Sequence, residues 1–123
     1  MEISEFNPLA LRNLARLNNR THRKLLVVDG RVGFIGGVGI ADEWAGHAQD
    51  PDHWRDNHFQ VEGPVVAQLQ SAFVDHAVAL GQSVSSGDAY FPPLSPAGEV
   101  RAHVFKSAPR GGNASLRLMY LMR

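Results

Sequence analysis

The sequence predicts an α/β fold in which a small β-sheet is packed by helices. Short runs of branched apolar residues alternate with turn residues between positions 24 and 62, a pattern typical of strands. Apolar residues then recur every three or four positions from 64 to 80, as in an amphipathic helix. The length of 123 residues and the 44% hydrophobic content agree with one folded domain rather than a disordered chain.

The first elements follow from local signals. A proline at position 8 and spaced leucines predict a helix over 8–17. Residues 24–28 (KLLVV) form a short apolar run, which predicts a buried strand. Asp29-Gly30 predicts a two-residue hairpin turn, because both central positions of that turn favour positive φ. The returning strand is therefore expected over 31–35.

A glycine-rich turn and a long loop are expected next. Residues 36–39 (GGVG) predict a tight turn, and residues 40–45 predict one or two helical turns. Residues 46–57 are polar and contain a proline, which is typical of a loop. Apolar and polar residues alternate over 58–63, which predicts a half-buried strand.

The longest expected helix spans 64–80 and ends at Gly81. Its predicted core stripe consists of Val65, Val66, Leu69, Phe73, Ala77 and Leu80. Residues 82–98 are rich in Ser, Pro and Gly and predict a connector. A further strand is expected over 99–106 and a last helix over 114–123.

The composition excludes several classes of protein. Twelve basic and twelve acidic residues give a formal net charge of zero, so strong non-specific binding to nucleic acid is not predicted. The absence of cysteine excludes disulfides, thiolate zinc sites and cysteine catalysis. Neither a transmembrane run nor a signal peptide is recognised. We therefore expect a location in the cytoplasm or peripheral to the cytoplasmic membrane.

One group of residues indicates a chemical function. His22, Lys24 and Asp29 form an H-x-K-x4-D pattern, which is followed by Gly36-Gly37. On an extended strand His22 and Lys24 project from the same face, because side chains alternate. A neutral imidazole can attack phosphorus, and an ammonium group compensates the charge that develops on the phosphoryl oxygens. Side-chain-free glycines let backbone N–H groups approach those oxygens. The pattern therefore predicts a phosphate-handling site.

In these residues the sequence resembles the phospholipase D superfamily, and most closely its bacterial cardiolipin synthase-like members. The resemblance runs from about residue 19 to 73, and more loosely to 109. It is carried by THRKLLVVDGRVGFIGGVGIADEW and WRDNHFQVEGPVVAQLQSAF. It implies a phospholipase D-like half-domain with a mixed β-sheet packed by helices. Gly39 stands where the family pattern usually has Asn, and this loses a side-chain amide donor.

The resemblance also implies roles for the motif residues. His22 would form a phosphohistidine intermediate, and Lys24 would bind the phosphate. Asp29 matches the third residue of the catalytic motif, with a role more structural than reactive. The expected substrate-binding residues are Gly36, Gly37 and Gly39.

A further acidic residue in the family hydrogen-bonds the nucleophilic imidazole. The matching position is Asp56, just before the strand expected at 58–63, and Asp50 or Asp52 are the alternatives for this role. A carboxylate capping the end of that strand is the other interpretation of Asp56.

Family enzymes pair two such motifs, the second histidine acting as a general acid, whereas one motif is present here. We therefore expect a truncated chain. Residues 1–81 would be part of the first catalytic domain, 82–98 a linker and 99–123 the start of the second half. The partner is then the second half of the full-length chain or a homodimer partner.

The predicted function is phosphatidyl transfer or phosphodiester hydrolysis on phospholipids, with an alcohol or water as acceptor and no cofactor or metal. The alternatives are a nuclease-type phosphodiesterase of the same superfamily, for which nucleic acid is the less favoured partner, and an inactive phosphate-binding remnant. A metal site is a further rival, because possible ligands crowd one stretch: His47, Asp50, Asp52, His53, Asp56 and His58. The candidates for an apolar groove are Ile40, Trp44 and Trp54, for which ordinary core packing is the other interpretation.

Overall fold

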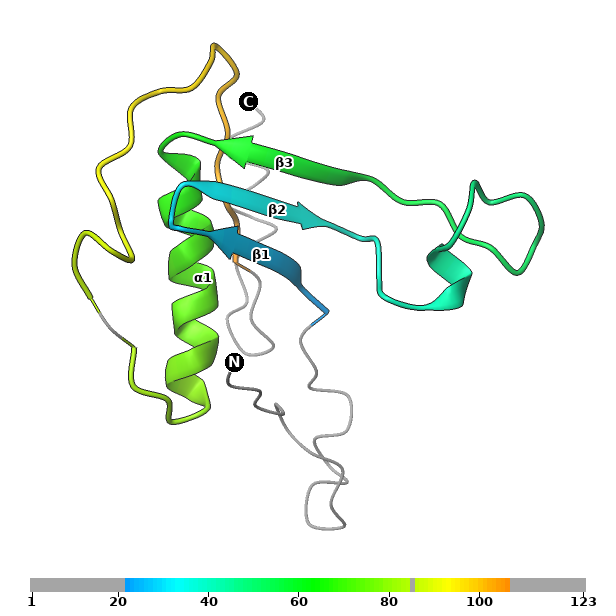
Figure 1. Cartoon of the computed structure of the whole chain (residues 1–123), viewed down its shortest axis with the longest axis horizontal. Helices are drawn as coiled ribbons and strands as arrows, with labels where there is room; N and C mark the ends of the chain where they lie inside the picture. The colour runs from blue at the N-terminus through cyan, green and yellow to red at the C-terminus, as the bar shows by residue number, and fades with distance from the viewer. Residues whose placement is uncertain (1–21, 85, 107–123) are drawn as a thin grey trace.

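The computed structural model describes residues 22–84 and 86–106, which contain three strands, one short 3-10 helix and one α-helix (Figure 1). The helices expected over 8–17 and 114–123 lie outside the described residues. Within the described ranges, no helix is both long and apolar enough to cross a membrane.

The sheet is formed by β1 (Lys24–Val28), β2 (Val32–Gly36) and β3 (His58–Glu62), in the order β1-β2-β3. Each strand lies within one residue of its expected bounds, so the three strands are confirmed. The expectation that β1 is buried is wrong, because Leu26 is 57% and Val28 is 42% exposed on the sheet face that α1 does not cover. Both pairs are antiparallel, so the described part of the sheet is antiparallel where a mixed sheet was expected. The β1–β2 turn has φ of 52° at Asp29 and 62° at Gly30, which confirms the predicted hairpin turn.

Helix α1 (Val65–Ala79) packs on one face of the sheet (Figure 1). The contact is close at Gly33, where an added Cβ would lie 2.6 Å from Leu69 Cδ1 and 3.2 Å from Val61 Cγ2. Among the described residues, Pro92 is buried against the hairpin turn, and the other buried apolar side chains belong to α1: Val66, Leu69, Ala72 and Ala77. The core therefore lies between α1 and the sheet face that carries Gly33.

The expected helix is confirmed, but its core stripe is partly wrong. Phe73 is 52% exposed, whereas Gln70 is buried. Ala77, one turn beyond Phe73 on the same stripe, is buried, so apolar spacing alone does not tell which positions of the stripe are covered. Gly81, with φ of 74°, follows the end of the helix, as C-terminal glycines often do.

The strand expected over 99–106 is wrong, because none of these residues has strand structure. The segment instead makes contacts with α1. The amide of Val104 donates to Gln68 Oε1 at 2.9 Å, and Lys106 Nζ lies 2.6 Å from Asp75 Oδ2. A helix side chain thus satisfies a backbone donor that a strand would have given to a neighbouring strand.

Candidate active site

His22 and Lys24, the first two residues of the motif, lie at the end of the sheet farthest from the hairpin turn. Lys24, the first residue of β1, is the register partner of Gly36, and Gly36 is the partner of His58. We call these three residues the Gly36 row. Because Lys24 shares its sheet face with Leu26 and Gly33 lies on the opposite face, the row belongs to the face away from α1. This end of the sheet extends beyond the helix toward the 37–57 loop (Figure 1).

His22 and Lys24 are accessible. His22 is exposed and lies two residues before the start of β1, while Lys24 is half-buried. Within the described chain neither side chain has a hydrogen bond or an ion pair. Arg23 between them reaches His76 of α1, with Nη1 3.2 Å from Nδ1. Because side chains alternate in an extended segment, His22 and Lys24 would both point away from that helix. This geometry is compatible with His22 and Lys24 on the same face of the strand.

Asp29 lies at the other end of the hairpin. It is five residues beyond Lys24, which corresponds to about 16 Å along a strand. The residue adopts positive φ in the turn, a conformation that Asp tolerates better than most residues. Its position therefore serves the turn rather than chemistry at the Gly36 row.

Asp56 lies at the same end of the sheet as His22 and Lys24. Its carboxylate fills the space that a Cβ on Gly37 would take, and its Oδ1 accepts a hydrogen bond from the Asn57 amide at 2.7 Å. Gly37 N donates to Asn57 O at 3.1 Å, which continues the β2–β3 pairing by one residue. No hydrogen bond joins Asp56 to His22 among the described residues, so that pairing stays a prediction.

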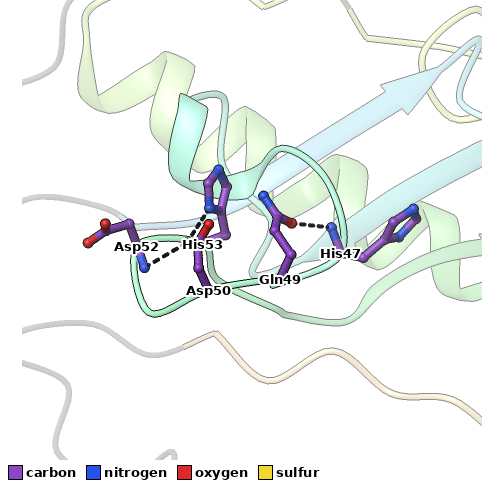
Figure 2. A network of polar contacts seen from close by, with 5 residues as sticks. All are labelled: His47, Gln49, Asp50, Asp52 and His53. Carbon is purple, nitrogen blue, oxygen red and sulfur yellow. Dashed lines mark hydrogen bonds and ion pairs between the residues drawn. The ribbon is translucent and has the colours of Figure 1, made fainter.

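Of the two alternatives to Asp56, Asp50 uses its carboxylate within the loop, whereas Asp52 contributes only its backbone amide there (Figure 2). Asp50 Oδ1 lies 2.5 Å from His53 Nδ1 and accepts the Asp52 amide at 3.0 Å. Nearby, the His47 amide donates to Gln49 Oε1 at 3.0 Å. In the described chain no group of three or more His, Asp or Glu side chains is placed to hold a metal ion. The metal alternative therefore has no geometric support in this part of the molecule.

Gly39, which stands where the family pattern usually has Asn, lies against the ring of Trp44. Trp44, which ends the 3-10 helix η2 (Asp42–Trp44), places Nε1 2.6 Å from where a Cβ on Gly39 would lie. Its ring meets Trp54 edge-to-face with centroids 5.4 Å apart. The indole of Trp44 thus occupies the space of a side chain at position 39.

The two tryptophans line an open pocket of about 320 Å³. The lining residues are Val38, Trp44, Gly46, His47, Ala48, Trp54, Arg55 and Asp56. The core interpretation is wrong for Ile40, which is fully exposed, and for Trp54, which is 57% exposed. Polar and charged groups share the pocket with the tryptophans, so it is not a purely apolar groove.

His58 is a candidate site residue that the motif analysis missed. It lies in the Gly36 row, on the same face of the sheet as Lys24. His58 is not followed by a lysine two positions later, so the H-x-K pattern does not include it. The signal that could have found it is the antiparallel register, which places the first residue of β3 beside the last residue of β2.

Comparison with known proteins identifies a class of relatives in the phospholipase D superfamily. These are bacterial cardiolipin synthases. The chain is 37% identical over 103 residues to a cardiolipin synthase of Staphylococcus aureus, an alignment that covers 82% of the chain and 21% of the relative. It is 32% identical over 115 residues to cardiolipin synthase 2 of Staphylococcus epidermidis, covering 92% of the chain and 23% of the relative. A cardiolipin synthase of Listeria innocua is 35% identical over 96 residues, covering 76% of the chain and 20% of the relative.

The chain spans about a fifth of the length of these relatives. No protein-family profile matches the chain, and no solved structure matches it. The similarity agrees with the resemblance found in the motif residues, and the small α/β unit is consistent with a phospholipase D-like half-domain.

Proposed function

We propose that this chain carries one catalytic half-site of a phospholipase D-type phosphatidyltransferase that acts on phospholipids at a membrane surface. The observation that carries the proposal is the accessibility of His22 and Lys24 beside Gly36. The names of the relatives support a phospholipid rather than a nucleic acid as substrate. Because the chain covers a fifth of those relatives, the activity is proposed for the whole protein.

In the first step an imidazole nitrogen of His22 attacks the phosphorus of the phosphodiester. The bond between phosphorus and the leaving oxygen breaks, and that oxygen keeps the electron pair and takes a proton from a general acid. The product is a phosphohistidine. Lys24 compensates the negative charge on the phosphoryl oxygens, and Asp56 compensates the positive charge that the imidazole acquires.

In the second step an alcohol or water attacks the same phosphorus. The phosphorus–nitrogen bond breaks, the acceptor oxygen loses its proton to the group that acted as acid, and His22 returns to its starting state. We assign that acid to a second half-site, either in the full-length chain or in a homodimer partner. Residues 1–81 would then belong to the first half, 82–98 to a linker and 99–123 to the start of the second half.

The test uses a substrate whose leaving group needs no general acid. A p-nitrophenyl phosphodiester releases p-nitrophenolate without protonation, so the half-site of the 123-residue chain is sufficient for the first step. We expect a stoichiometric burst of p-nitrophenolate and a phosphoryl adduct on residue 22, which mass spectrometry of the peptides detects.

The decisive variant is His22→Ala, for which we expect neither burst nor adduct. The matched control is His53→Ala, which removes another partly accessible imidazole that contacts Asp50 in the loop, and we expect it to retain both. An unchanged burst in His22→Ala would refute the proposed nucleophile.

A further inference from the structure

We propose that His58 binds the phosphoryl group from the β3 side of the site, opposite Lys24. This inference rests on the proposed function, and it adds a phosphate-binding residue from outside the H-x-K pattern. The phosphoryl group would lie over Gly36, between the two side chains.

The register places both side chains around one position. Lys24 and His58 are the partners of Gly36 on its two sides, so their backbones are separated by two strand spacings, about 10 Å. Side chains of one row point to the same face of a sheet. An ammonium group and an imidazole therefore flank a residue that has no side chain.

The contacts at Gly36 place His58 directly beside this glycine. A Cβ on Gly36 would lie 2.9 Å from His58 Cγ and 2.6 Å from His58 Cα. Any side chain at position 36 would therefore collide with His58. The atom nearest to that Cβ is the backbone oxygen of Asn57, so the glycine is required by the close approach of the β3 backbone, and it adds no side chain between His58 and Lys24.

The imidazole of His58 is available to a ligand. The residue is exposed, and within the described residues its side chain has no hydrogen bond or ion pair. Its neighbours on the same strand face, Gln60 and Glu62, bond to one another, with Gln60 Nε2 donating to Glu62 Oε1 at 3.1 Å. A ring N–H is present in both the neutral and the protonated imidazole, so His58 has a donor for a phosphoryl oxygen in either state.

The experiment is a titration of the 123-residue chain with inorganic phosphate at constant pH, followed by the imidazole C2–H resonances in NMR. We expect the His22 and His58 resonances to shift with a common midpoint. The resonances of His53 and His103, which belong to the 37–57 loop and the C-terminal segment, serve as internal references and should not follow that midpoint.

Two substitutions at position 58 separate binding from folding. His58→Phe removes the donor, and we expect the Kd for phosphate to rise about tenfold or more, as for the loss of a hydrogen bond to a charged group. His58→Gln keeps an N–H donor and should give a smaller rise. The matched control Gln60→Ala changes the same face of β3 two residues farther from the row, and it should leave the Kd within about twofold, because no group that contacts phosphate is removed.

The outcomes distinguish this inference from the proposed function. If Lys24→Ala weakens phosphate binding while His58→Phe does not, and the His58 resonance is unmoved, the inference on His58 is overturned and the half-site stands. If phosphate does not bind to the unaltered chain in a saturable way, both proposals fail.

Discussion

The carboxylate of Asp56 occupies the volume that a Cβ on Gly37 would need. The glycine at this position is therefore required by the protein's own packing, whatever ligand binds nearby. The Gly37 amide is also used internally, since it donates to Asn57 O. The two residues together fix the point at which β2 leaves the sheet and the loop returns to β3.

Gly37→Ala is expected to displace Asp56 and to destabilise the chain. Because Asp56 is exposed and its carboxylate can rotate aside, the cost should lie at the low end of overpacking, about 1 kcal/mol, which urea denaturation measures as a lower midpoint. We also expect the p-nitrophenolate burst to slow, because the displaced carboxylate is the group that we propose compensates the positive charge of the phosphohistidine. The matched control is Gly98→Ala, since a Cβ at Gly98 meets nothing within 4 Å; an equal loss in both variants would contradict this account.

Gly33→Ala tests the packing of α1 on the sheet. The new Cβ would lie 2.6 Å from Leu69 Cδ1, and Leu69 is only 1% exposed, so neither group has room to move. We expect a loss of about 1–3 kcal/mol in the free energy of unfolding. Leu69→Ala removes the methyl group with which the new Cβ collides. In the double variant Gly33→Ala/Leu69→Ala, the free energy of unfolding should therefore be little lower than in Leu69→Ala alone. Additive losses in the double variant would mean that Leu69 is not what limits position 33.

The interaction between Lys106 and Asp75 is expected to contribute little. Its nitrogen–oxygen distance is 2.6 Å, but the two side chains are 40% and 53% exposed, so water and salt screen the pair. Lys106→Met should lower the free energy of unfolding by at most about 1 kcal/mol. Leu69→Ala, which empties a fully buried site, should cost about 2–5 kcal/mol. A larger loss in Lys106→Met than in Leu69→Ala would show that the C-terminal segment, rather than the sheet, dominates the packing of α1.

Local sequence signals were sufficient for most of the described fold. Strand β1 and its turn were predictable because Asp29 and Gly30 both tolerate positive φ and the flanking residues are branched and apolar. The segment around Val104 was not, because its backbone donor goes to Gln68 of α1. That contact joins residues 36 positions apart, and no local pattern encodes it.

The candidate site was predictable in part for a related reason. Spacing along the chain identified His22 and Lys24, since both belong to one segment. His58 comes from another strand, and its place beside Gly36 depends on pairing across β2. Trp44 fills the space beside Gly39 only because the 37–57 loop folds back on itself. The polar composition of the loop does not specify that fold.

Position 39 offers a test of that packing. Restoring the usual family residue with Gly39→Asn would place a Cβ 2.6 Å from Trp44 Nε1 and 3.1 Å from its Cδ1, so the indole must move. The edge-to-face contact between Trp44 and Trp54 would then be lost, and aromatic pairs of this kind contribute about 0.5–1.5 kcal/mol. We expect a lower urea midpoint and altered tryptophan fluorescence for Gly39→Asn. In a Trp44→Ala background the same change should cost almost nothing, because the colliding ring is absent and the introduced asparagine side chain has room. If Gly39→Asn destabilises both backgrounds equally, the constraint at this position comes from the backbone and not from the indole.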